Sequence, residues 1–232
     1  MTCGVVIPAA GSSRRMETVD KTLTLLAGRP VLDWVLDAFE SVTGISEIIL
    51  ATGERNEMAV RRIVAARGFG PPITVCRGGA TRQESVAAGI ACLPPEVDLV
   101  LIHDAARPLI TPDLIQRGIA LARECGSAIA AVPVVDTIKQ VDLTDRVLAT
   151  PSRAALYASQ TPQIFRRGWL MEAFARIQDL PTVVTDEASL LELAGFPVFI
   201  YPGHPENLKL TTSIDLVVAG ELLERRASRR AG

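Results

Sequence analysis

Short runs of β-branched residues recur along the chain, and segments with the apolar spacing of a helix separate them. The runs occupy 5–8, 48–51, 73–76, 99–102 and 128–132. A strand followed by a helix and another strand normally forms a right-handed crossover, which makes neighbouring strands parallel. The alternation therefore predicts an α/β fold built on a doubly wound, mostly parallel sheet.

Local signals mark where some of the helices begin. Thr111 is followed by Pro112, which is typical of a helix N-cap and first turn, and Thr81 with Glu84 has the spacing of a capping box. One apolar helix face is expected from Val31, Leu32, Val35, Leu36 and Phe39, and another from Leu114, Ile115, Ile119, Leu121 and Ala122. These segments supply the layers that cover the sheet.

The pattern changes after Pro133. Residues 134–153 alternate apolar and polar side chains around a turn-like 143–145, which predicts a projecting β-hairpin. Its edges would be exposed unless another chain covers them, and the simplest such chain is a second copy of the protein. We therefore expect one domain over 1–232, with 134–153 as a β-arm that forms a homodimer.

Beyond this arm we expect helices at 169–177 and 186–194 and a strand at 198–201. A last helix is expected from Ser213 to about Glu224, and the basic residues after it are expected to form a frayed tail.

Composition limits the partners and the location. Lys and Arg number 24 against 26 Asp and Glu, which argues against a nucleic-acid-binding surface. The four cysteines are dispersed without zinc-ligand spacing, so free thiols in a reducing compartment are expected. No apolar run is long enough to span a bilayer and no signal peptide is evident, which favours a cytoplasmic protein without a membrane partner.

The first predicted strand leads into a loop of small and basic residues, PAAGSSRRM, at 8–16. Backbone N–H groups in such a loop can approach phosphate oxygens closely, and ligands of open α/β sheets bind at the carboxyl ends of strands. The loop matches neither GxxxxGK[ST] nor GxGxxG. We interpret it as a triphosphate cradle of another kind.

Motifs across nearly the full length narrow this interpretation. Lys21 follows the loop, Arg82 and Ser85 follow a Gly-Gly pair, and further blocks lie at 103–108, 133–137, 161–163, 185–188 and 207–211. In content and order these blocks resemble the 2-C-methyl-D-erythritol 4-phosphate cytidylyltransferase family. The resemblance implies a Rossmann-like nucleotidyltransferase sheet and transfer of CMP from CTP to a sugar-alcohol phosphate.

The resemblance also implies a role for each matching residue. Arg15 and Lys21 would stabilise the transition state and the leaving pyrophosphate, and Arg153 and Lys209 would hold the acceptor phosphate. Asp104 would bind Mg²⁺ or another divalent cation, as a hard oxygen ligand does.

The remaining implied contacts fall into two groups. The nucleotide side comprises Ala9, Ala10, Gly11, Gly79, Ala80, Ser85 and Ala105, with Arg82 as a nucleotide contact or a scaffold. The acceptor side comprises Arg107, Asp136 and Thr137, and the arm would carry Thr137 and Arg153 into the partner subunit's site.

Two positions depart from the family pattern, and other functions stay open. Asp20 precedes Lys21 where proline is usual, and Ala80 lacks a polar side chain. Apart from the resemblance, Asp104 could serve a turn and Lys209 an outward strand position. The alternatives are a ribitol 5-phosphate cytidylyltransferase, a nucleotide-binding regulatory module without turnover, and a dehydrogenase, which the missing GxGxxG disfavours.

Overall fold

The computed structural model describes residues 1–10, 21–68, 70–177 and 185–231. Within these residues, seven strands form one sheet in the order β11-β7-β10-β6-β1-β4-β5. They are β1 (Cys3–Ala9), β4 (Ile45–Thr52), β5 (Ile73–Arg77), β6 (Leu99–Ile102), β7 (Ser127–Pro133), β10 (Tyr157–Arg166) and β11 (Ile200–Pro202). The pairs β1–β4, β1–β6, β4–β5 and β7–β11 are parallel, whereas β10 runs antiparallel to β6 and β7. The predicted doubly wound, mostly parallel sheet is confirmed.

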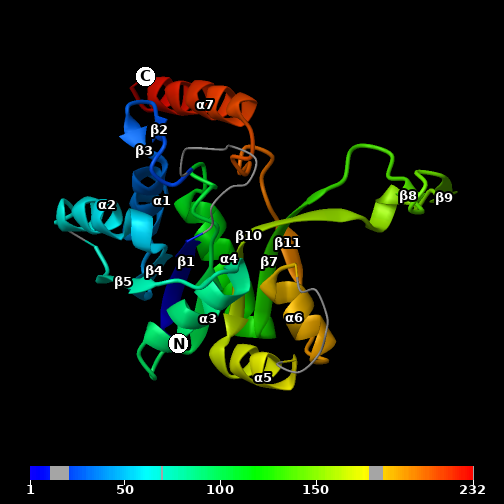
Figure 1. The fold of residues 1–232 in the computed structure, drawn as a ribbon, viewed down its shortest axis with the longest axis horizontal. Helices are drawn as coiled ribbons and strands as arrows, with labels where there is room; N and C mark the ends of the chain where they lie inside the picture. The colour runs from blue at the N-terminus through cyan, green and yellow to red at the C-terminus, as the bar shows by residue number, and fades with distance from the viewer. Residues whose placement is uncertain (11–20, 69, 178–184, 232) are drawn as a thin grey trace.

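Helices cover both faces of this sheet (Figure 1). One face packs against α1 (Val31–Glu40), α2 (Glu54–Ala65) and α4 (Pro112–Cys125). The other packs against α3 (Arg82–Cys92), α5 (Arg167–Ile177) and α6 (Glu187–Leu193). No helix that the structure describes is both long and apolar enough to cross a membrane.

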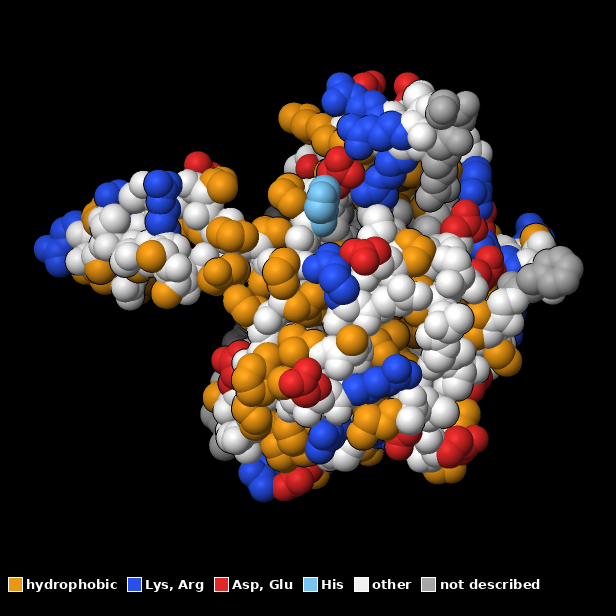
Figure 2. Space-filling model, turned by 180° about the vertical axis from the view of Figure 1, so that it is seen from behind, with side chains coloured by type: hydrophobic (Ala, Val, Ile, Leu, Met, Phe, Trp, Pro, Cys, Tyr) orange, Lys and Arg blue, Asp and Glu red, His pale blue; other side chains and the backbone are white. Residues whose placement is uncertain are grey.

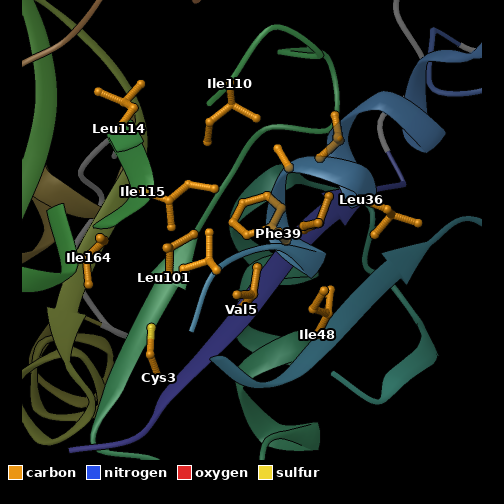
Figure 3. Packing of buried hydrophobic residues seen from close by; sticks show 14 of the residues in the cluster. Cys3, Val5, Leu36, Phe39, Ile48, Leu101, Ile110, Leu114, Ile115 and Ile164 are labelled. Carbon is orange, nitrogen blue, oxygen red and sulfur yellow. The ribbon is translucent and has the colours of Figure 1, made fainter. Parts of the chain in front are cut away.

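The strand sequences explain why two layers of helices are needed. Successive side chains of a strand point to opposite faces, so Val5 and Ile7 enter one buried cluster while Val6 enters the other. Figure 3 shows Leu36 and Phe39 of α1 packed toward the first of these faces. Because the strands are apolar on both sides, the polar groups of a ligand site are left to the strand ends.

Both predicted helix starts are confirmed. The Thr111 hydroxyl accepts a hydrogen bond from the Leu114 backbone N–H, with Pro112 at the first turn. Thr81 and Glu84 form a reciprocal capping box at the start of α3. This capping box fixes the chain just after Gly79 and Ala80, which belong to the expected nucleotide side.

The expected hairpin is present as β8 (Gln140–Val141) and β9 (Val147–Ala149), which pair antiparallel. Asp142 accepts hydrogen bonds from the N–H groups of Thr144 and Arg146, and Asp145 adopts a left-handed conformation with φ 62°. Figure 1 shows this hairpin extending away from the sheet. The 3₁₀ turn η1 (Arg153–Ala155) and β10 bring the chain back, and β2 (Leu25–Leu26) with β3 (Arg29–Pro30) forms a second small hairpin.

The prediction of a frayed tail after Glu224 is wrong, because the last helix α7 (Ser213–Ala231) continues through those residues. Three contacts hold this last part of the helix. Arg225 pairs with Glu221 one turn earlier, and Arg226 binds both Glu206 and the carbonyl oxygen of Leu109. The strand expected at 198–201 begins at Ile200, and β10 was not predicted at all.

Candidate active site

The expected site residues lie where parallel strands end. Ala9 ends β1, Gly78 and Gly79 follow β5, and Asp104 lies two residues after β6. These strands are parallel and close together in the sheet, so their carboxyl ends share one edge. This edge is where open α/β sheets bind ligands.

The nucleotide side of this edge is closely packed. A Cβ atom on Gly78 would lie 2.6 Å from the Ala10 Cβ, and one on Gly79 would lie 2.2 Å from the Glu84 Cβ. The Gly79 N–H donates to the Ser85 hydroxyl at 3.1 Å, and that hydroxyl donates to the Thr81 carbonyl oxygen at 2.8 Å. Both glycines are therefore required by close approach, and the structure brings Ala10, Gly79 and Ser85 together as expected.

Ala9 is buried at the end of β1, and Ala80 is exposed with its N–H donating to a Glu84 carboxylate oxygen at 2.7 Å. Ala105 is buried next to Asp104. Gly11, Arg15 and Asp20 lie outside the described residues, so their expected roles stay predictions.

Asp104 is the centre of a cluster of charges. The residue is 8% exposed, and its carboxylate lies 3.1 Å from the Arg82 Nε, 2.8 Å from the Lys209 Nζ and 3.7 Å from the Arg107 Nε. Arg82 also donates through Nη1 to both carboxylate oxygens of Glu187, at 2.7 and 2.9 Å. Three cations therefore surround the buried Asp104 carboxylate, and one of them, Arg82, also pairs with the buried Glu187 of α6.

The cations keep Asp104 ionised. Burial by itself raises the pKa of this carboxyl, but attraction to Arg82, Lys209 and Arg107 holds the pKa well below its usual range. Burial lowers the pKa of Arg82, yet Glu187 and Asp104 raise it further, so the guanidinium stays charged. Burial raises the pKa of Glu187, and the attraction of Arg82 offsets only part of this rise.

A chain of hydrogen bonds fixes the backbone at Asp104. The ring of His103 is fully buried, and burial lowers its pKa to about 4, so it is neutral at pH 7. Its Nε2 lies 3.1 Å from the Arg107 carbonyl oxygen and must carry the proton, which leaves Nδ1 to accept from the Thr161 hydroxyl. The Asp104 N–H donates to the same hydroxyl oxygen at 3.1 Å. His103 is thus a structural residue.

Lys209 and Lys21 meet at one segment. The Arg107 Nη1 donates to the Asn207 carbonyl oxygen, and the Leu210 N–H donates to the Ala106 carbonyl oxygen, so residues 207–210 lie against the loop that carries Asp104. The Lys21 ammonium donates to the carbonyl oxygens of Leu210 and Thr211, at 3.1 and 2.9 Å. This segment therefore contacts Lys21, which is expected at the leaving pyrophosphate, and itself carries Lys209, which is expected at the acceptor phosphate.

The arm residues are not part of this cluster within the chain. Asp136, Thr137 and Arg153 are exposed, and the Arg153 guanidinium donates to the Val135 carbonyl oxygen at 2.6 Å. Their expected role toward the acceptor stays a prediction.

Sequence reasoning gave no role to Glu187, although it lies in the family-like block at 185–188. Thr161 and Gln163, in the block at 161–163, were likewise left without a role. Gln163 accepts from the Ala188 N–H and donates to Asp186, which caps α6 and so holds Glu187 in place. The sequence signal that could have identified Glu187, Thr161 and Gln163 is their position in the two family-like blocks.

Asp104 is the carboxylate at this edge that would meet a divalent cation. Among the residues that the structure describes, no group of three or more histidine, cysteine, aspartate or glutamate side chains could hold a metal. A single aspartate with nucleotide phosphate oxygens is nevertheless a common environment for Mg²⁺. The donor set at Asp104 fits a cation that arrives with a triphosphate.

A mostly parallel sheet with closely packed glycines at its carboxyl edge, next to a carboxylate surrounded by cations, is suited to binding a nucleotide and its phosphates. The family model described as 2-C-methyl-D-erythritol 4-phosphate cytidylyltransferase matches residues 3–225. The chain belongs to this family and is a cytidylyltransferase.

Relatives and solved structures match nearly the full length of the chain. A 2-C-methyl-D-erythritol 4-phosphate cytidylyltransferase of Dehalococcoides mccartyi (strain CBDB1) is 42% identical over 222 residues, 96% of each chain. The 4-diphosphocytidyl-2C-methyl-D-erythritol synthase of Anaerococcus prevotii has 31% identity and a TM-score of 0.86, with 96% of this chain and 98% of that one covered. The 2-C-methyl-D-erythritol 4-phosphate cytidylyltransferase of Thermus thermophilus has 32% identity and a TM-score of 0.79, with the same coverage.

Proposed function

We propose that the protein transfers CMP from CTP to 2-C-methyl-D-erythritol 4-phosphate, with release of pyrophosphate. The observation that carries this proposal is the convergence of Arg82, Arg107 and Lys209 on Asp104 at the ligand edge of the sheet. In a chain of this family, such a cluster supports a site that brings two phosphorylated substrates together.

The nucleotide side supports a pyrimidine rather than a purine. Ala10, Gly79 and Ser85 are packed so closely that a Cβ on either Gly78 or Gly79 would collide with a neighbour. A narrow pocket of backbone groups can reject a larger base by size and pair with the polar edge of cytosine. Because Ala80 offers only its backbone, we expect backbone groups to make much of this recognition.

The chemical step needs no general base. A phosphate monoester has its second pKa at about 6, so the acceptor is largely dianionic at neutral pH. One of its oxygens attacks the α-phosphorus of CTP, and the bond to the bridging oxygen of the β-phosphate breaks as pyrophosphate leaves. The enzyme's task is to align the two phosphates and to offset the negative charge that builds up.

The chain's own cations would meet that charge. We assign Arg15 and Lys21 to the transition state and the leaving pyrophosphate, and Lys209 and Arg107 to the acceptor phosphate. Asp104 would hold Mg²⁺, or another divalent cation, which when bound supplies charge neutralisation on the phosphate oxygens. Lys209 and Arg82 already neutralise Asp104 in the free protein, so the Lys209 ammonium must move when a cation and phosphates enter.

An acceptor panel tests the substrate. With CTP and Mg²⁺, pyrophosphate release should require methylerythritol phosphate, and ribitol 5-phosphate should support it at least about tenfold less well, the discrimination that one misplaced polar contact gives. Faster turnover of ribitol 5-phosphate would select the alternative cytidylyltransferase. CTP binding without turnover of either acceptor would select the regulatory module.

We also propose that the protein is a homodimer joined through the 134–153 arm. Exposed apolar side chains cluster on the arm and near its base, and Figure 2 shows them along the projecting hairpin and on the adjoining body. They include Val135, Ile138, Val141, Leu143, Val147, Leu148, Tyr157, Phe199 and Ile200. Apolar surface of this kind on an exposed hairpin is typical of an interface.

A mixed dimer tests whether the arm completes the partner's site. If Arg153 acts across the interface, a heterodimer of a Lys21→Ala subunit and an Arg153→Ala subunit has one site with both side chains and one with neither. Each homodimer should be inactive, and the isolated heterodimer should recover about half of wild-type activity because one of its two sites is complete. No recovery in a verified heterodimer would place Arg153 in its own subunit's site.

The cytoplasm is the location we propose. All four cysteines, Cys3, Cys76, Cys92 and Cys125, are free thiols, which supports a reducing compartment.

A further inference from the structure

Glu187 is a buried carboxylate beside the site. It is the first residue of α6 and is 2% exposed. A buried charge is costly unless it is paired and hydrogen-bonded. Glu187 accepts two hydrogen bonds from Arg82 Nη1, so α6 is tied to the first residue of α3.

Arg82 is shared between two carboxylates. Its Nη1 is held by Glu187, while its Nε donates to Asp104 Oδ1 at 3.1 Å. A guanidinium is rigid and planar, so fixing one nitrogen sets the direction in which the others point. Without Glu187, the Arg82 guanidinium could rotate and donate two parallel hydrogen bonds to the Asp104 carboxylate.

Hydrogen bonds from α6 itself and from β10 fix the position of Glu187. Asp186 caps α6 by accepting from the Ser189 N–H, and Gln163 binds both Asp186 and the Ala188 N–H. Gln163 of the block 161–163 and Asp186 of the block 185–188 therefore fix the start of α6, and with it the position of Glu187.

We propose that Glu187 is a positioning residue of the cytidylyl-transfer site. It holds the Arg82 guanidinium on Asp104 Oδ1 alone, so that Oδ2, which pairs with Lys209 in the free protein, becomes available to the cation and the nucleotide phosphates when Lys209 turns to a substrate phosphate. The inference rests on the proposed function, because it assigns Asp104 to the nucleotide and its cation. A purely structural contact between α3 and α6 would instead affect the stability of the fold and leave the affinity for CTP unchanged.

The test is CTP binding to the whole protein, measured by calorimetry with Mg²⁺ and without acceptor. Glu187→Gln keeps the shape and one acceptor oxygen but removes the charge. It should weaken CTP binding about 10- to 100-fold and raise the Mg²⁺ concentration needed for half-maximal binding, the usual cost of losing a partner of a metal-binding carboxylate. Arg82→Lys, which cannot hold both carboxylates, should weaken binding by a similar factor.

The double variant separates positioning through Arg82 from any other route. If Glu187 acts through Arg82, then Glu187→Gln with Arg82→Lys should bind CTP no more weakly than Arg82→Lys alone, within about twofold. If the factors by which the two substitutions weaken CTP binding multiply in the double variant, Glu187 acts by another route and the proposal is overturned. CTP affinity that is unchanged in Glu187→Gln would also overturn it.

A matched control uses a pair elsewhere. Glu40, the last residue of α1, binds Arg67, which lies two residues after α2, so Glu40→Gln breaks a half-buried Glu–Arg pair and should leave CTP affinity unchanged. If Glu187→Gln does not fold, Arg82→Lys decides alone, and unchanged affinity there overturns the proposal. A wild-type protein that binds no CTP would instead contradict the proposed function itself.

Discussion

Replacement of Lys21 by alanine is expected to lower kcat by about 10³-fold, while KM for CTP changes by less than about tenfold. The reason is that charge on the leaving pyrophosphate grows only as the bond to the α-phosphorus breaks, so an ammonium placed there acts mainly in the transition state. The structure fixes this ammonium on the carbonyl oxygens of Leu210 and Thr211, beside Lys209. The measurement is pyrophosphate release with both substrates saturating.

Two further variants make this result specific. Lys21→Arg keeps the charge but changes its position and should retain part of the activity. Arg61→Ala removes an exposed cation of α2 that pairs with Glu57, and it should leave kcat within about twofold. A Lys21→Ala protein that folds normally and keeps kcat within tenfold would remove Lys21 from the proposed mechanism.

The sheet could be predicted because its physical signal is local. Val5, Val6 and Ile7 are buried on alternating faces, and such a run can only be satisfied by helices on both sides. The start of α3 was predictable for the same reason, since Thr81 and Glu84 cap the helix from within its own first turn.

β10 could not be predicted because its polar residues are buried for tertiary reasons. Gln160 binds the His204 carbonyl oxygen and Asn207, Thr161 binds His103, and Gln163 binds Asp186. These partners are distant in sequence, so the segment lacks an apolar strand pattern. The helical tail was missed likewise, because Arg226 is held by Leu109 and Glu206.

The site shows the same division. Resemblance to a family identified Arg82, Asp104, Arg107 and Lys209, and the structure brings these four together. Sequence did not indicate that Arg82 would be divided between Asp104 and Glu187, because the burial of a glutamate depends on which helix covers it. The roles of Arg15 and of the arm residues Asp136, Thr137 and Arg153 stay predictions.

Asp104→Asn is expected to abolish turnover, by about 10³-fold or more, and also to destabilise the protein. The catalytic loss follows because asparagine offers a neutral oxygen where a divalent cation needs a carboxylate, so excess Mg²⁺ should not restore the rate. The loss of stability follows because Arg107 and Lys209 keep their charges but lose a common counter-ion, whereas Arg82 retains Glu187. The side chain of Lys209 is 44% exposed, so solvent screens the contribution of the Lys209–Asp104 pair to stability. We therefore expect a decrease of about 2 kcal/mol in the free energy of unfolding at pH 7.

The pH dependence distinguishes this electrostatic origin from a packing defect. The folded-state pKa of Asp104 lies below its unfolded value of about 3.9, so its contribution is fully present above about pH 4 and is lost as the pH falls further. Denaturant unfolding should therefore give wild type and Asp104→Asn a constant difference near neutrality and converging values in acid. Asp113→Asn removes an exposed carboxylate of α4 that pairs with Arg117, and it should match wild type within about 0.5 kcal/mol at every pH. A deficit in Asp104→Asn that persists unchanged in acid would mean that lost packing, rather than lost attraction to the surrounding cations, is the cause.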